Sequence, residues 1–459
     1  MFTGAPEASS PGTNHREPTL PIMSLFTLPS EQLLHFIWQG LRFDHRKLQT
    51  TCGKSVSILE TGVLNEDQGP DFLQAQLKID GIAFHGHVEI HVDGRDWYRH
   101  RHQSDPHYNP VILHVVFSPT GRNIESQSGH IIPELVIGNR IAEELLTQYD
   151  QLRLSQEKIA CESQFSGIPV NVIQRWVDRL AIERMQDKAQ KFQERLNRSH
   201  QHWEQVLWEE IAARMAGPVN EEAFRDLARR VPASLLNKYR TNRDQLEALM
   251  LGGAGMLHSS AEGPVKMWKD QWQFLQAKYQ IAGFSEPVRF LRMRPASFPT
   301  FRLSQLAHLW NQSGGVISYL ETTGIDRLLK TQIQGSEYWK SHIRPGESAT
   351  PASRVLGKTL KAILIVNVLL PLGWLYQVAH GRENPFEWLE ENLLSLPAET
   401  NKHTRIFTEL GVVNTRALES QALIQLHKQY CLPKRCLNCH LGQFLLERSP
   451  RSARSDSSA

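Results

Sequence analysis

Residues 69–91 read GPDFLQAQLKIDGIAFHGHVEIH, and this stretch decides the fold expected for the first part of the chain. The alternating run after Asp71 predicts a strand, and the central Asp-Gly pair is a hairpin signal. The return run then predicts a second, antiparallel strand, on which Glu89 and His91 share one face. The hairpin brings Asp71 toward both. Two carboxylates beside a base are the groups that bind a divalent cation and activate a water molecule.

Further strand patterns surround this hairpin. The run at 111–117 is apolar on both faces, so we expect a central strand that is covered on each side. Ahead of the strands, Ser30 is expected to cap a helix that begins at Glu31. The strand patterns lie at 46–51, 54–60, 73–79, 82–92, 111–117 and near 131–137. Residues 25–160 are therefore expected to form a mixed α/β domain.

The rest of the chain has a helical period. Amphipathic segments begin at Val170 and follow one another to about residue 429, with no strand pattern among them. The predicted fold class is α+β, with the mixed sheet domain followed by an all-helical domain at 161–446. Segments 1–24 and 447–459 are rich in small and polar residues and are expected to be disordered.

The overall composition is that of a globular protein with a small net charge of +3. This charge gives no argument for nucleic-acid binding by the chain as a whole, so any basic patch must be local. No signal peptide is expected at the N-terminus. The most apolar stretch, 363–375, contains Pro371 and is short for a membrane span, so it predicts a buried helix broken near that proline. We expect a cytoplasmic protein without a membrane partner.

The C-terminal cysteines form a second candidate site. Cys431, Cys436 and Cys439 are spaced closely enough to hold one metal ion from a compact loop. The fourth ligand of a zinc site would be Cys161 or the adjacent His440. The arrangement is also similar to that of some helicase-associated nucleases, in which one early and three late cysteines hold an iron–sulfur cluster. There, however, the early cysteine precedes the nuclease core. Zinc and an iron–sulfur cluster both remain open.

An arginine-rich stretch is a candidate nucleic-acid-binding segment. Arg292, Arg294 and Arg302 alternate with Phe298 and Phe301, a mixture that suits a phosphate backbone with stacked bases. The alternative is an ordinary loop between helices, in which the arginines pair with carboxylates.

The hairpin resembles the PD-(D/E)XK nuclease superfamily in its Pro70-Asp71 and Glu89-Ile90-His91 motifs. The resemblance implies a nuclease-like sheet domain in which Asp71 and Glu89 bind Mg²⁺ or Mn²⁺. It also implies that Glu31, on the first helix, completes the site and that His91 orients or deprotonates the attacking water. His91 stands where the superfamily usually has Lys. A neutral imidazole lacks the fixed charge of an ammonium group, which changes the chemistry available at that position.

Nearly the whole chain, residues 24–446, resembles a bacterial family known as domain of unknown function 2851. The resemblance implies membership of that family and no particular activity. The motifs that carry it are Glu31-Gln-Leu-Leu-His-Phe-Ile-Trp38, Gly69-Pro-Asp-Phe72, Gly86-His-Val-Glu-Ile-His91, Leu113-His-Val-Val116, Arg294-Pro-Ala-Ser-Phe-Pro299 and the cysteine-rich end.

Three functions follow as hypotheses. The first is a divalent-metal-dependent nuclease, or a nuclease-derived protein that binds DNA or RNA. The second is a catalytically silent scaffold whose helical domain binds a protein partner. The third is a metalloenzyme acting on a small molecule, in which His87, Glu89 and His91 are the metal ligands and His114 is the obvious fourth.

Overall fold

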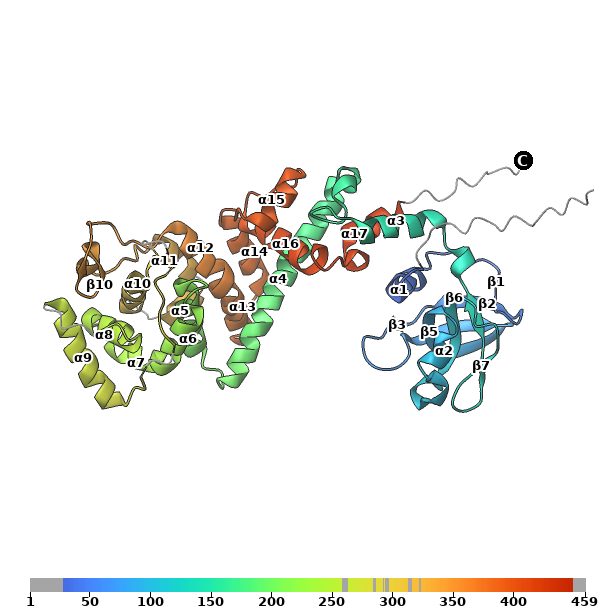
Figure 1. Cartoon of the computed structure of the whole chain (residues 1–459), viewed down its shortest axis with the longest axis horizontal. Coiled ribbons are helices and arrows are strands. Elements are labelled where there is room, and N and C mark those ends of the chain that lie inside the picture. Colours follow the sequence, from blue (N-terminus) through green and yellow to red (C-terminus); the bar gives the residue numbers. More distant parts are fainter. Residues whose placement is uncertain are drawn as a thin grey trace, which may run out of the picture. The chain divides into compact units, whose positions relative to one another are not determined.

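The chain divides into two compact units, a sheet unit and a helical unit (Figure 1). The sheet unit comprises Met1–Cys161 and Lys434–Ala459, and the helical unit comprises Glu162–Pro433. In the computed structural model of the protein, the described residues are 28–257, 263–283, 286–291, 293, 297–312, 316–321 and 323–448. The segments expected to be disordered, 1–24 and 447–459, lie outside the described residues except for Glu447 and Arg448. The predicted α+β fold class is confirmed.

The sheet unit is built on a mixed sheet of seven strands. Its order is β1-β2-β4-β5-β6-β9, with β3 paired to β4. Neighbouring strands are antiparallel as far as β5, whereas β5, β6 and β9 run parallel to one another. The bounds are β1 (Leu48–Gln49), β2 (Ser55–Glu60), β3 (Val63–Leu64), β4 (Phe72–Ile79), β5 (Ile82–Asp93), β6 (Val111–Ser118) and β9 (Glu134–Val136). A two-stranded sheet of β7 (Ile124–Glu125) and β8 (Ile131–Ile132) lies beside it.

The hairpin between β4 and β5 forms where it was predicted. Asp80 and Gly81 have φ angles of 49° and 81°, the left-handed values that a tight hairpin of this kind requires. The strand register pairs Phe72 with Val88, so Asp71 lies opposite Glu89. A register shift follows Phe72, which re-aims the side chains next to this pair.

Helix α1 (Glu31–Gln39) covers β5. The Ser30 side chain accepts a hydrogen bond from the amide of Leu33, which confirms the predicted cap. The apolar stripe of α1, including Leu34 and Trp38, is fully buried. Because α1 is held by this packing, the residues of its first turn are fixed beside the start of β4.

A parallel pair such as β5 and β6 needs a crossover connection. Here the connection is short and consists of α2 (Asp96–Arg99) and the 3-10 turns at His102–Ser104 and Pro106–Tyr108. Trp97 is fully buried, and its indole N–H donates to the carbonyl of Glu125. This anchor folds the connection against the sheet.

The C-terminal segment belongs to the sheet unit, although the sequence placed it in the helical domain. Helix α17 (His440–Glu447) packs on α3 (Glu143–Leu154), and the short turn Cys436–Asn438 contacts α1. An ion pair joins Arg42 and Glu447 at 2.7 Å. Sequence periodicity could not predict this return, because the segment is helical in either unit.

The helical unit is centred on α4 (Val170–Arg198), which packs along α16 (Ala417–Gln425) and α13 (Leu370–Ala379) (Figure 1). Two short strands, β10 (His342–Arg344) and β11 (Glu347–Ser348), occur in this unit although no strand was predicted there. The other α-helices are α5 (Trp203–Ala216), α6 (Glu221–Arg230), α7 (Ala233–Tyr239), α8 (Arg243–Gly253), α9 (Pro264–Tyr279), α10 (Pro299–Asn311), α11 (Gly324–Lys330), α12 (Lys358–Leu364), α14 (Pro385–Ser395) and α15 (Lys402–Glu409).

The apolar stretch lies in one continuous helical segment, Lys358–Ala379. Pro371 does not break it, because a π-helical turn at Ile365–Leu369 precedes the proline and the helix continues as α13. By length and composition alone, the segment could cross a membrane. However, 56% of its apolar window is buried, and α13 packs on α4. We therefore interpret it as a core helix of the helical unit.

Candidate functional site

Asp71 and Glu89 face each other where β4 meets β5. The amide of Asp71 donates to Glu89 Oε2 at 3.1 Å, and the amide of Ile90 donates to Asp71 Oδ2 at 2.9 Å. An aspartate nitrogen lies within roughly 5 Å of its own carboxylate oxygens, so the two carboxylates lie within roughly 8 Å of each other. The structure therefore brings together the two carboxylates that the sequence singled out.

Helix α1 contributes two more polar side chains. His35 Nε2 lies 3.3 Å from Asp71 Oδ2. Burial raises the pKa of Glu31, and the nearby Asp71 carboxylate raises it further. Glu31 and His35 are four residues apart and so share one helix face. The first turn of α1 thus points toward the Asp71 carboxylate, as expected for Glu31.

Glu89 is buried without a cationic side chain. It is 5% exposed, and burial, together with Asp71 and Glu31, raises its pKa to about 9. Within the described part of the chain, no Lys or Arg forms an ion pair with any of these three carboxylates. An ionised carboxylate in such surroundings is costly unless a cation or hydrogen-bond donors compensate it.

Three histidines gather around the other oxygen of Glu89. Ring nitrogens of His91, His100 and His102 all lie within 4.8 Å of one another. His91 Nε2 is 3.2 Å from His100 Nδ1. Glu89 Oε1 is 3.5 Å from His91 Nε2 and 3.2 Å from His102 Nε2. Three imidazoles therefore offer ligand nitrogens close to one another above β5, and Glu89 Oε1 lies beside two of them.

The crossover connection delivers two of these histidines. His102 stacks on Tyr108 with ring centroids 3.8 Å apart, and Trp97 packs edge-on against it. Arg101, just before His102, has a left-handed φ of 63°, which turns the chain back over β5. His102 is 8% exposed, whereas His100 lies at the surface. The site is thus closed on the sheet side and open at His100.

A polar chain continues from His91 into the sheet. His91 Nδ1 lies 2.8 Å from His114 Nε2 on β6, and His114 Nδ1 lies 3.4 Å from Glu134 Oε2 on β9. Burial and the neighbouring imidazoles, His114 first, lower the pKa of His91 to about 2. Burial raises the pKa of Glu134, but the hydrogen bonds from His114 and Thr120 outweigh this effect and lower the pKa. A neutral imidazole is thus linked to an ionised carboxylate through a second imidazole.

Other residues predicted for ligand sites have different surroundings. His87 was predicted as a metal ligand together with His91, but its Nδ1 accepts a hydrogen bond from the amide of Gln74 at 3.3 Å. The imidazoles that lie beside His91 are those of His100 and His102. Arg292 and Arg294 lie outside the described residues. Arg302 lies on α10, where burial lowers its pKa and its guanidinium donates to Gln305. Its contact with nucleic acid stays a prediction.

Three of the predicted cysteine ligands are neighbours in the sheet unit. Burial, together with the thiols of Cys439 and Cys436, raises the pKa of Cys161 to about 12. Burial and Cys439 likewise raise the pKa of Cys436 to about 11. Cys161 is thus close enough to Cys436 and Cys439 for their charges to influence one another, and their joint binding of a metal stays a prediction. Cys431 ends a π-helical turn of the helical unit, and its part in the site stays a prediction.

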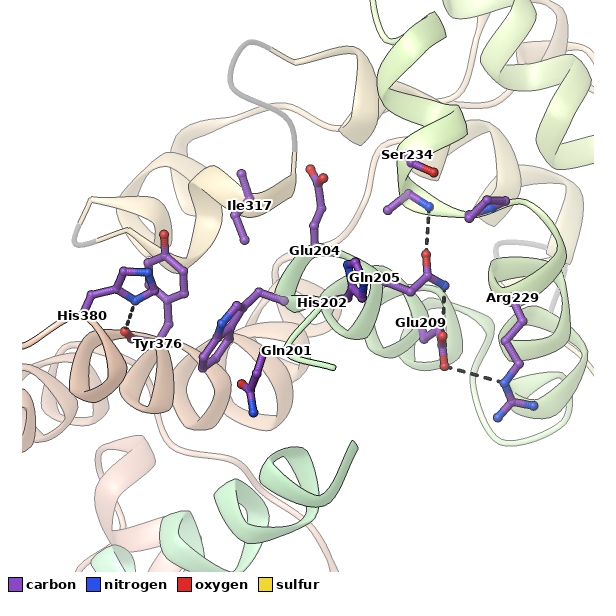
Figure 2. A pocket seen from close by; sticks show the side chains of 13 residues that line it. Gln201, His202, Glu204, Gln205, Glu209, Arg229, Ser234, Ile317, Tyr376 and His380 are labelled. Carbon is purple, nitrogen blue, oxygen red and sulfur yellow. Dashed lines mark hydrogen bonds and ion pairs between the residues drawn. The ribbon is translucent and has the colours of Figure 1, made fainter. Parts of the chain in front are cut away.

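A pocket of about 700 Å³ lies in the helical unit (Figure 2). Its polar side chains bond to one another or to the backbone. Gln205 donates to Glu209 at 2.9 Å, Arg229 Nε lies 3.6 Å from Glu209, and His380 Nδ1 lies 2.7 Å from the carbonyl of Tyr376. The Arg229 contact joins α6 to α5, whereas the other two lie within one helix or at its end, and we assign no chemistry to the pocket.

The chain matches the sequence model of a protein family over residues 31–402. The chain belongs to the DUF2851 family. That family is described as protein of unknown function, and the matched range includes all of the carboxylates and histidines gathered at Glu89. Comparisons with curated proteins and with solved structures find no significant match. For this DUF2851 protein, the likeness to PD-(D/E)XK nucleases stays a resemblance of motifs.

Several site residues could not be found from the sequence motifs. His35 had a usable signal, because it lies four residues after Glu31 and therefore on the same helix face. His100 and His102 stood out only as part of a histidine-rich connection. Glu134 gave no signal, since its place depends on the parallel pairing of β6 with β9. The resemblance placed the carboxylates but not the imidazole cluster.

Proposed function

We propose that this DUF2851 protein is a divalent-metal-dependent nuclease, or a nuclease-derived protein that binds DNA or RNA, in the cytoplasm. One observation carries the proposal: Asp71 lies opposite Glu89 on antiparallel strands, with Glu31 close by and no Lys or Arg paired to these carboxylates in the described residues. A phosphodiester needs a cation to offset the charge that develops during hydrolysis, and such carboxylates are typical ligands for it.

In this proposal Asp71 and Glu89 would hold Mg²⁺ or Mn²⁺, with help from the carbonyl of Ile90. Such an ion lowers the pKa of a bound water and stabilises negative charge on the phosphate. The hydrogen bonds between Asp71 and the facing strand fix both carboxylates before substrate arrives. His91 stays neutral and would orient the attacking water by accepting a hydrogen bond from it, and Glu31 would orient a second water or ion.

The cysteine cluster enters the same proposal as a structural site. Cys161, Cys436 and Cys439 would hold Zn²⁺ or an iron–sulfur cluster. Metal binding would relieve the repulsion between thiolates that raises the pKa of Cys161 and Cys436. The chemistry at Glu89 does not require this site.

The histidine group supports a second candidate function, a metalloenzyme acting on a small molecule. Its ligands would be His91, His100 and His102, and His87 would have no part. The hypothesis of a silent scaffold for a protein partner has no specific contact in its favour among the described residues. The nuclease proposal is preferred because it alone gives Asp71 and Glu31 a role beside Glu89.

The test is a cleavage assay with labelled single- and double-stranded DNA and RNA in Mg²⁺ or Mn²⁺. We expect cleavage by the wild type and a loss of at least about 100-fold in Glu89→Gln and Asp71→Asn, the scale seen when a group that stabilises transition-state charge is removed. The control is Glu125→Gln, which changes an exposed carboxylate of the same unit. Failure of the wild type to cleave any of these substrates would contradict the proposal.

A further inference from the structure

We propose that His91, His100, His102 and Glu89 form a tetrahedral site for a zinc-class transition-metal ion. The inference goes beyond the proposed nuclease, whose ion lies between Asp71 and Glu89 and has oxygen ligands. Each of the three imidazoles offers one ring nitrogen to the group, and Glu89 Oε1, close to His91 Nε2 and His102 Nε2, is the proposed fourth ligand.

Three of the six separations in this proposed site are close to those expected around one ion. Ligands roughly 2.0–2.1 Å from a tetrahedral ion lie roughly 3.3–3.4 Å from each other. The measured values are 3.2 Å from His91 to His100, 3.2 Å from His102 to Glu89 and 3.5 Å from His91 to Glu89. His102 Nε2 is buried and makes no hydrogen bond within the described residues, although Glu89 Oε1 is in range. Two lone-pair atoms that face each other in this way suit a shared cation.

The ligand types select the class of metal. Three imidazole nitrogens and one carboxylate oxygen are preferred by Zn²⁺ and its first-row neighbours, whereas Mg²⁺ prefers oxygen ligands only. Glu89, His91 and His102 are nearly inaccessible to solvent, so the ion would be held in a largely dry site. The exposed His100 provides the entry path that such a site needs.

The chain from His91 to Glu134 fixes the orientation of the central ligand. Glu134 Oε2 lies 3.4 Å from His114 Nδ1 and favours the tautomer that carries its proton on that nitrogen, which leaves His114 Nε2 as the acceptor for the proton on His91 Nδ1. His91 Nε2 then carries the lone pair and faces the proposed ion. Carboxylates that act through imidazoles in this way hold metal-ligating histidines in a single tautomer. Glu134 and His114 are therefore positioning residues.

Glu89 connects this site to the proposed nuclease centre. Its Oε1 faces the histidines, while its Oε2 accepts from the amide of Asp71. The carboxylate is thus placed to bridge two ions, an arrangement that in two-metal hydrolases stabilises the attacking and leaving oxygens together. The zinc-class site itself can be tested without any substrate.

The test is a titration of metal-stripped full-length protein with Co²⁺, followed by its visible spectrum, and with Zn²⁺, followed by calorimetry. Tetrahedral Co²⁺ with nitrogen and oxygen ligands absorbs strongly in the visible region and lacks the near-ultraviolet charge-transfer band of Co²⁺ bound to thiolates. The charge-transfer band therefore distinguishes Co²⁺ bound to the cysteines from Co²⁺ bound to the histidines. We expect one equivalent of this thiolate-free signal in the wild type.

Substitutions of single residues show which side chains bind the metal that gives this signal. His100→Gln changes a surface residue, so folding should persist, and we expect affinity to fall by at least about 100-fold. The matched control is His107→Gln, an exposed histidine of the same connection that pairs with Asp105 and should bind like the wild type. Glu134→Gln should weaken binding about 10- to 100-fold while all four ligands remain.

Two results would overturn the inference: a wild type without the thiolate-free signal, or a His100→Gln variant that binds as tightly as His107→Gln. Unchanged metal binding by Glu134→Gln would show that Glu134 does not position the ligand His91. The inference and the proposed function fail separately. Metal binding without cleavage of nucleic acid leaves this site standing and contradicts the nuclease, whereas cleavage by a wild type that lacks the thiolate-free signal does the reverse.

Discussion

Two buried carboxylates, one in each unit, differ in the groups that surround them and compensate their negative charge. Glu210, in the helical unit, is 2% exposed and forms ion pairs with Arg225 and Arg195. Glu89, in the sheet unit, is 5% exposed and is surrounded by imidazoles and other carboxylates. A carboxylate that only stabilises a fold is paired with an arginine, as Glu210 is. Glu89 is arranged as a ligand, and this difference leads to the assignment of a metal site.

The largest effect is expected at the cysteines, the other place in the sheet unit where ligand-type groups meet. Cys436→Ser should remove the bound metal and lower the melting temperature of the sheet unit by more than about 10 °C, because metal binding in structural zinc sites contributes directly to folding. The measurement is calorimetry together with elemental analysis for zinc and iron.

Cys52→Ser provides the matched control. Cys52 is an exposed cysteine of the same unit, so its substitution should change neither metal content nor melting temperature. Protein purified with or without oxygen that contains neither metal would contradict the cysteine site.

Glu210→Gln should have the next largest effect. It leaves Arg225 buried with only weaker partners at Glu221 and Glu222, and breaking a buried ion pair costs about 3 kcal/mol. The transition of the helical unit should fall by roughly 5–10 °C in a calorimetric scan. An unchanged transition would mean that the ion pair is not what distinguishes the two units.

Gly94→Ala should produce a smaller loss that is confined to the sheet unit. A Cβ at Gly94 would come within 2.6 Å of Glu134 Oε2 and would also press on Thr120. Such overpacking costs about 1–3 kcal/mol, and it should also weaken Co²⁺ binding by displacing the carboxylate behind His114. Denaturant unfolding and the Co²⁺ spectrum measure the two consequences. A loss of stability with unchanged Co²⁺ binding would show that Glu134 does not influence the metal site.

Glu89→Gln should have the smallest effect on stability, with the opposite sign. Removing a buried carboxylate that lacks a cationic side chain should leave the metal-free melting temperature unchanged or raise it by about 2–4 °C, which corresponds to about 1 kcal/mol. Added Zn²⁺ should then stabilise the wild type but not the variant. A large drop for metal-free Glu89→Gln would show that Glu89 is a structural residue like Glu210.

The sequence predicts the sheet unit well where the signals are local. Ser30, the tight turn at Asp80-Gly81 and the apolar run of β6 all lie where their patterns placed them. The pairing of Asp71 with Glu89 follows from an antiparallel hairpin of the observed length. Local turn chemistry and strand alternation are enough to predict this part of the site.

The remainder depends on contacts between distant segments. His102 reaches Glu89 because Trp97 and Tyr108 fold the connection back on the sheet, and no short motif encodes that path. Glu134 enters through a parallel strand pairing. Likewise, a helical sequence pattern does not indicate that α17 belongs to the sheet unit. The sequence therefore predicts the two carboxylates and His91, but not the imidazoles of His100 and His102 that lie beside it.

The most direct test of the account is a crystal structure of the full-length protein grown with Zn²⁺, with anomalous scattering recorded at the zinc edge. We expect a peak roughly 2.0–2.1 Å from Glu89 Oε1 and from nitrogens of His91, His100 and His102. Anomalous peaks at the cysteines alone, with Glu89 bound to no cation at saturating Zn²⁺, would contradict it.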